Sequence, residues 1–146
     1  MIIYTIGFTK KNASDFFGLV KANRIAMMID VRLNNSSQLA GFSKCPDIEY
    51  FLREICGCGY AHELIFAPSA ELMEDFKSKK IKLAQYEKIY SELMDERKAP
   101  DHFVKNYSKL DNVCLLCSED TPVNCHRRVL AELLVKVLAG ASVKHL

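Results

Sequence analysis

Residues 117–128 (CSEDTPVNCHRR) carry the strongest chemical signal in this chain. Apolar residues at helical spacing follow them, starting with Leu130, and predict a helix with one buried face. His126 lies four residues before Leu130 and Arg127 three residues before it, so both share that face. The sequence therefore predicts a histidine and an arginine on the buried side of a helix's first turn, directly after a strand.

Arg127 stands at the predicted N-terminus of this helix, where a cation is unfavourable unless an anion lies beside it. That anion is either a carboxylate of the protein, from Glu119 or Asp30, or a phosphate or carboxylate of a ligand. The first reading makes Arg127 a structural ion pair, and the second makes it a ligand-binding group. The same segment offers Glu119 or His126 for proton transfer. It also offers Cys125 as a nucleophile, its thiol pKa lowered by the helix terminus and the neighbouring cations.

A second group of polar residues lies at the ends of other predicted strands. Asp30 and Arg32 are two residues apart in an extended segment, so they share a face and form either a structural salt bridge or part of a site. The carboxyl ends of parallel strands gather into one crevice, where we expect these residues to meet the segment 117–128. The catalytic candidates are Glu119, Cys125 and His126, and the ligand-binding candidates are Gly7, Thr9, Asp30, Arg32, Ser37 and Arg127.

Several common catalytic motifs are absent from the sequence. A phosphatase loop separates its cysteine from its arginine by five residues, but Val123 stands at that spacing from Cys117. No G-x-S-x-G nucleophile elbow occurs, which argues against a serine hydrolase of that type. Neither a G-x-G-x-x-G fingerprint nor a Walker loop is present, so the ordinary dinucleotide and nucleoside-triphosphate motifs are missing.

The six cysteines do not predict disulfides or a metal site. Without a secretory signal, a chain of 146 residues can build a core that needs no disulfides. The closest pairs are Cys56 with Cys58 and Cys114 with Cys117. In a strand, residues three apart point to opposite faces and lie about 10 Å apart, so Cys114 and Cys117 could not share an ion. We expect buried, inert thiols and no metal.

The pattern along the chain alternates strands with helices. Strands are predicted at residues 2–6, 26–31, 60–66, 113–117 and 143–146. Helices are predicted after a cap at Asn12 or Ser14, from Pro46 to Gly57, from Ser69 to Lys79, over about 82–98, and from Thr121 or Asn124 to Leu138. This alternation predicts an α/β fold: residues 1–146 form one small three-layer domain with a mostly parallel sheet flanked by helices.

Composition excludes several classes of protein. With 49% hydrophobic and 26% charged residues, the chain is neither disordered nor fibrous. No apolar run reaches the roughly 18 residues that a membrane span needs. The apolar segment Met1–Ile6 has no basic region before it and no cleavage site, so we interpret it as a strand and expect a cytoplasmic protein. A net charge of +2 gives no sign of a nucleic-acid partner.

Several short motifs, in order over nearly the whole chain, carry a family resemblance. They are Thr5-Ile6-Gly7, Asp30-Val31-Arg32, Ser37 with Gly41-Phe42, Leu64 with Ala67-Pro68, and Leu116-Cys117-Ser118-Glu119 with Pro122 and Cys125-His126-Arg127. The chain resembles domain-of-unknown-function family 488, and the last motif is the most specific. The resemblance implies a small, cytoplasmic, microbial α/β protein, and it implies no settled biochemical function. After Gly7 the chain has Phe8-Thr9, where a His-Ser pair is usual in the family.

These observations favour an enzyme that acts on a small phosphorylated or nucleotide-like ligand, in an anion-binding crevice at the carboxyl ends of the strands. One alternative is a non-catalytic sensor that binds such a ligand through the same arginines. Another is a nucleic-acid-associated module whose phosphate contacts come from Lys10, Lys11, Arg24 and the cluster Lys77–Lys82. The sequence leaves the cofactor, the substrate and the oligomeric state open.

Overall fold

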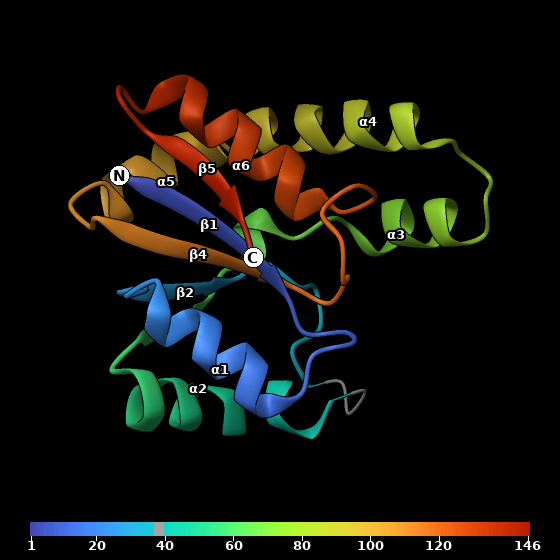
Figure 1. The fold of residues 1–146 in the computed structure, drawn as a ribbon. Coiled ribbons are helices and arrows are strands. Elements are labelled where there is room, and N and C mark those ends of the chain that lie inside the picture. The colour runs from blue at the N-terminus through green and yellow to red at the C-terminus, as the bar shows by residue number, and fades with distance from the viewer. Residues whose placement is uncertain (37–39) are drawn as a thin grey trace.

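A computed structural model describes residues 1–36 and 40–146, which fold around a five-stranded sheet (Figure 1). Every strand pairing is parallel, and the strand order is β3-β2-β4-β1-β5. The predicted α/β fold with a mostly parallel sheet is therefore confirmed. The strands are β1 (Ile2–Gly7), β2 (Met27–Asp30), β3 (Gly59–His62), β4 (Asn112–Cys117) and β5 (Ser142–His145).

Helices cover both faces of the sheet and complete three layers (Figure 1). One face is covered by α1 (Ala13–Ala22) and by α2 (Asp47–Phe51), which continues as a π-helical turn, η2 (Leu52–Cys56). The opposite face is covered by α3 (Ala70–Lys77), α4 (Leu83–Glu96), α5 (Ala99–Tyr107) and α6 (His126–Val137).

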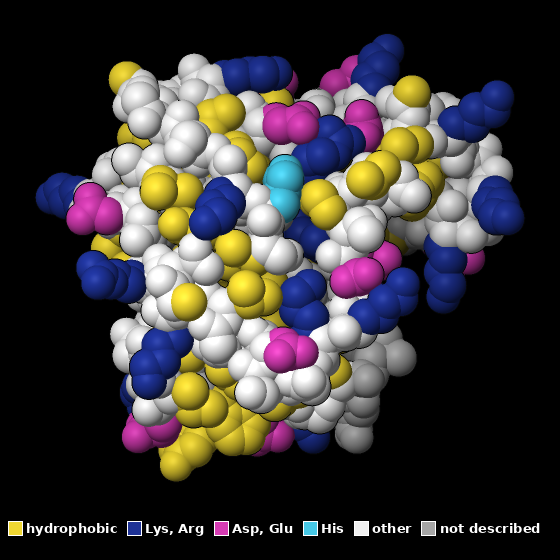
Figure 2. Space-filling model, viewed as in Figure 1, with side chains coloured by type: hydrophobic (Ala, Val, Ile, Leu, Met, Phe, Trp, Pro, Cys, Tyr) yellow, Lys and Arg dark blue, Asp and Glu magenta, His cyan; other side chains and the backbone are white. Residues whose placement is uncertain are grey.

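The alternation of side chains along each strand feeds two separate apolar cores. In β1, Ile3 packs toward α4 and α6, whereas Tyr4 packs toward α1. In β4, Cys114 belongs to the α1 side and Cys117 to the α6 side. The prediction that these two thiols point to opposite faces is thus confirmed. Figure 2 shows hydrophobic side chains gathered over the α1–α2 layer at the bottom of the view.

Helix ends follow the capping residues that the sequence indicates. The Asn12 side chain accepts a hydrogen bond from the Asp15 amide at 2.8 Å and begins α1. Ser69 caps α3 in the same way through the Leu72 amide. Gly57 ends η2 with φ at +62°, a conformation that glycine adopts without a steric penalty.

Two elements differ from the sequence expectation. The strand predicted at residues 60–66 ends at His62 and is followed by a 3₁₀ turn, η3 (Leu64–Phe66). The carbonyl of Phe66 accepts a hydrogen bond from the Tyr90 hydroxyl at 2.6 Å, so contacts from α4 hold this turn out of the sheet. Helix α5 was not predicted, although Phe103 and Tyr107, four residues apart and buried, are its signal.

Among the described residues, no helix has both the length and the apolar character that crossing a membrane requires.

Candidate functional site

The carboxyl ends of β1, β2 and β4 meet at one edge of the sheet, as the parallel topology requires. The register pairs Gly7 with Cys117 and Asp30 with Leu116, so the last residues of the three strands lie side by side. Beyond the strands, the Thr9 amide donates to the Ser118 carbonyl at 3.1 Å. Several of the predicted site residues are therefore brought to the same edge.

Asp30 and Arg32 form a buried bidentate ion pair. Arg32 donates from Nε to Oδ1 at 2.8 Å and from Nη2 to Oδ2 at 2.6 Å, and neither side chain is more than 3% exposed. The Tyr60 hydroxyl also donates to Asp30, and Arg32 donates to the Ser43 carbonyl at 2.8 Å. These contacts tie the segment after β2 to its neighbours, which supports the structural reading of this pair.

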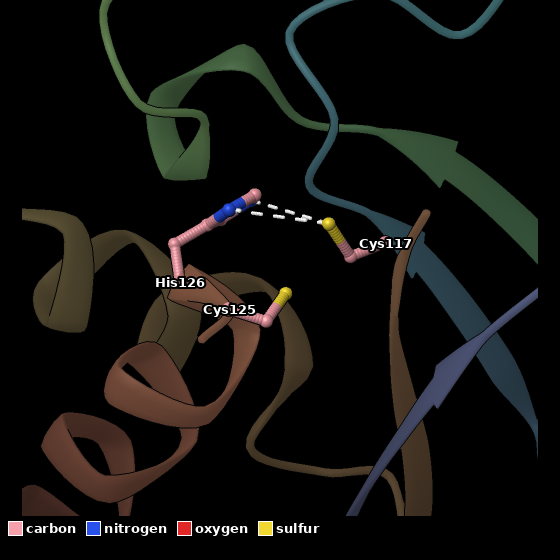
Figure 3. Close-up of side chains that lie close together, drawn as sticks. All are labelled: Cys117, Cys125 and His126. Carbon is pink, nitrogen blue, oxygen red and sulfur yellow. Dashed lines mark hydrogen bonds between the residues drawn. The ribbon is translucent and has the colours of Figure 1, made fainter. Parts of the chain in front are cut away.

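Cys117, Cys125 and His126 form a second cluster, on the other side of the sheet edge (Figure 3). All three are buried, and their sulfur and ring nitrogen atoms lie within 4.8 Å of one another. The Cys117 sulfur is 3.9 Å from both ring nitrogens of His126. His126 Nε2 lies 3.0 Å from the Val31 carbonyl and donates a hydrogen bond to it. The other ring nitrogen, Nδ1, takes no part in this bond.

The two thiols of this cluster differ in acidity. The pKa of Cys117 is held well below its usual value by a hydrogen bond from the Cys125 thiol and by the nearby charges of His126 and Arg127. The pKa of Cys125 is raised, first by its hydrogen bond to Cys117, then by burial and by the charge that Cys117 carries as a thiolate. The expectation that Cys125 carries the lowered pKa is therefore wrong, and Cys117 is the more acidic thiol of the pair. Burial is the largest single influence on the pKa of His126 and lowers it, but the charge of Cys117 and the hydrogen bonds to Cys117 and the Val31 carbonyl together outweigh burial, so the net shift is upward.

Arg127 is wholly buried and holds the loop between β4 and α6. It donates from Nη1 to the Glu119 carbonyl at 2.6 Å and from Nη2 to the Asp120 carbonyl at 3.2 Å. Nη1 also lies 3.4 Å from the Cys125 sulfur. Within residues 1–36 and 40–146, Nε has no partner and no carboxylate lies within ion-pair distance. The structural alternative, an ion pair of Arg127 with Glu119 or Asp30, is therefore wrong: the partners of Arg127 are main-chain carbonyls.

The two arginines lie on opposite faces of the sheet edge and do not share one crevice. Arg32 lies over the Phe8 ring at 5.2 Å, in the core next to α1. Arg127 belongs to α6, whose buried residues face the other core. The expected single crevice containing both arginines is wrong. Arg32 shares a face with Asp30, two residues before it, whereas Arg127 belongs to the helix that covers the opposite face. The hydrogen bond from His126 to the Val31 carbonyl links the Asp30–Arg32 pair to the cluster of Cys117, Cys125 and His126.

The remaining candidates differ in exposure. The side chains of Glu119 and Thr9 are exposed at the surface, whereas Gly7 is buried beneath the Glu119 carbonyl. Ser37 lies outside the residues that the structure describes. The structure also shows hollows of about 410 Å³ between α1 and η2 and about 280 Å³ between α4 and α6. Neither hollow is lined by the strand-end residues.

Cys117 belongs to the cluster but was not among the site residues predicted from the sequence. Cys114 and Cys117 face opposite sides of the strand as expected, whereas the contact of Cys117 with Cys125 and His126 was not among the sequence predictions. The available signal was topological: a strand end and the start of the following helix lie together at the carboxyl edge of a parallel sheet. A cysteine that ends a buried strand can therefore meet a Cys-His pair at the next helix.

The comparisons with known proteins give a family and no activity. The model of a family described as "Domain of unknown function DUF488" matches residues 12–134. No curated protein and no solved structure matches the chain.

Proposed function

The chain belongs to the DUF488 family, a domain of unknown function, and on this premise we propose an activity from its own residues. We propose that it is an enzyme that binds a small anionic ligand, phosphorylated or nucleotide-like, beside Arg127 at the start of α6. This site uses one face of the sheet edge, and the Asp30–Arg32 pair supports it from the other.

The observation that carries this proposal is the environment of Arg127. A guanidinium removed from water needs a compensating anion, and Arg127 is 0% exposed with only carbonyl and sulfur partners among the described residues. Within the part of the chain that the structure describes, its Nε is buried without a partner. Helix α6 begins at the same place, and the side chain of its N-cap residue, Cys125, makes no capping hydrogen bond to any described residue. An incoming anion would therefore meet a fixed positive charge and a helix terminus together.

Access to Arg127 requires the loop after β4 to move. The carbonyls of Glu119 and Asp120 occupy two of its donor groups, and a bound anion would replace them. The loop is held from outside by the surface ion pairs of Lys10 and Lys11 with Asp120, at 3.6 and 3.7 Å. Ion pairs near the surface contribute modestly to stability, so these two pairs add little to the cost of opening the loop. Glu119, exposed on this loop, is the proposed proton-transfer group.

A thermal-shift panel of nucleotides and phosphorylated metabolites tests this proposal, followed by turnover assays on each compound that shifts the melting temperature. We expect a shift with the parent protein and its loss in Arg127→Lys, which keeps the charge but not the fork. Arg128→Lys is the matched control, because Arg128 bonds Glu132 and Glu87 at the surface. A shift without turnover would identify a sensor instead, and the absence of any shift would contradict anion binding.

A reducing compartment such as the cytoplasm is part of the same proposal. All six cysteines are free thiols. Cys117 and Cys125 lie close enough that an oxidising environment would favour a disulfide between them.

A further inference from the structure

The cluster of Cys117, Cys125 and His126 has the ligand types that zinc prefers in proteins. Two sulfur atoms and one imidazole nitrogen converge from the end of β4 and the start of α6, as Figure 3 shows. We propose that these three side chains bind one Zn²⁺ ion. This inference rests on the cluster alone and does not depend on the anionic ligand proposed above.

The spacing of the ligand atoms fits an ion with small movements. Bonds of about 2.3 Å to sulfur and about 2.0 Å to nitrogen put tetrahedral ligand atoms roughly 3.5–3.8 Å apart. The Cys117 sulfur and the His126 nitrogens are already 3.9 Å apart, and all three ligand atoms lie within 4.8 Å of one another. A contraction of about 1 Å by side-chain rotation closes the cluster around the ion.

The orientation of His126 is the second observation that points to a metal. Its Nε2–H donates to the Val31 carbonyl at 3.0 Å, which fixes the ring and leaves Nδ1 as the nitrogen that can bind an ion once its proton is released. Zinc-binding histidines have this arrangement: one nitrogen binds the ion and the other donates to a carbonyl or carboxylate. His126 is buried, so the contact is maintained away from competing water.

The charges around the cluster are compatible with this ion. Any proton still on the two sulfur atoms or on His126 Nδ1 is released to solvent when these atoms bond to zinc, and the two thiolates then cancel the charge of Zn²⁺. Arg127 Nη1, 3.4 Å from the Cys125 sulfur, then donates to a thiolate, which holds that sulfur in place and offsets part of its charge. Arg127 keeps its positive charge beside a neutral centre.

The cluster supplies three ligands, so one tetrahedral position is open. Among the described residues, no fourth histidine, cysteine or carboxylate joins the group. Three protein ligands with an open position are typical of catalytic rather than structural zinc. An anionic ligand attracted by Arg127 is suited to occupy that position.

The test uses the full chain after chelator treatment under reducing conditions, titrated with Zn²⁺ or Co²⁺ and without any other ligand. We expect one equivalent of metal per chain, a higher melting temperature with zinc, and with cobalt the absorption bands of tetrahedral thiolate coordination. Cys117→Ala and His126→Asn should weaken binding by more than about 100-fold, since losing even an outer partner costs roughly 10–100-fold.

Cys114→Ala is the matched control, because Cys114 is equally buried in the same strand but faces the other core. It should bind cobalt like the parent. A parent without the thiolate–cobalt bands, or a Cys117→Ala variant that keeps them, would overturn the proposal.

A measurement on the parent protein covers the case in which a variant does not fold. Zinc should protect Cys117 and Cys125, but not the partly exposed Cys56, from iodoacetamide during slow partial unfolding, as peptide mass mapping would show. Equal labelling with and without zinc would contradict the site. Because no anionic ligand is present, failure here leaves the thermal-shift test of anion binding unaffected.

Discussion

The carbonyl oxygen of Glu119 lies in the space that a side chain at Gly7 would need. A β-carbon built on Gly7 would be 1.6 Å from that oxygen and 3.0 Å from Nη1 of Arg127. The end of β1 is therefore packed directly against the loop that Arg127 holds. Gly7 was predicted as a ligand-binding residue, and its observed contribution is to leave room for this loop.

Gly7→Ala should destabilise the protein by more than about 3 kcal/mol, because the atom it meets belongs to the main chain and cannot rotate away. Gly18→Ala is the matched control: Gly18 lies in α1 with no atom within 4 Å of its β-carbon position. That change should stabilise the protein by about 0.5–1 kcal/mol, since alanine favours a helix over glycine. Urea unfolding of both variants measures the difference, and similar stabilities would show that the loop adapts.

Arg127→Met should lower the free energy of unfolding by about 1–3 kcal/mol, the cost of leaving buried acceptors without their donor. The methionine keeps much of the apolar stem, so the packing loss is small. A broken buried ion pair would cost about 3–5 kcal/mol instead. Urea unfolding beside the parent decides between these values. No loss of stability would mean that the carbonyls of Glu119 and Asp120 find other donors.

Asp30→Ala should cost about 3–5 kcal/mol, because it leaves the guanidinium of Arg32 buried without its carboxylate. Glu92→Ala is a suitable control, since Glu92 pairs with Lys88 at 3.9 Å on an exposed helix face. The control should change stability by less than about 0.5 kcal/mol. A small effect in both variants would show that water reaches Arg32.

His145 should titrate below its usual pKa of 6.5, because partial burial and the positive charge of Arg127 both disfavour its protonated form. A folded-state pKa below the unfolded value means that the unfolded chain binds the proton more readily. This contribution to stability is therefore complete above pH 6.5 and falls as the pH drops through the lowered pKa. Titration of the ring signals by NMR measures the pKa, which should rise in Arg127→Met. An unchanged value would remove Arg127 as a cause.

Local patterns determined most of the elements. The caps at Asn12 and Ser69, the turn at Gly57 and the alternation that separates Cys114 from Cys117 act over a few residues, and the structure confirms them. The parallel sheet followed from the regular exchange of strands and helices. The burial of His126 and Arg127 at the first turn of α6 followed from helical spacing alone.

The partners of the buried polar groups were decided by tertiary structure. Sequence spacing predicted that Arg32 and Arg127 lie at the same edge of the sheet. The face that each side chain occupies depends on the path of the chain after β2 and after β4. Arg127 donates to main-chain carbonyls, which carry no sequence signature because every residue has one. Cys117 has the lowered pKa because Cys125, His126 and Arg127 surround it in space, and a pKa depends on those surroundings.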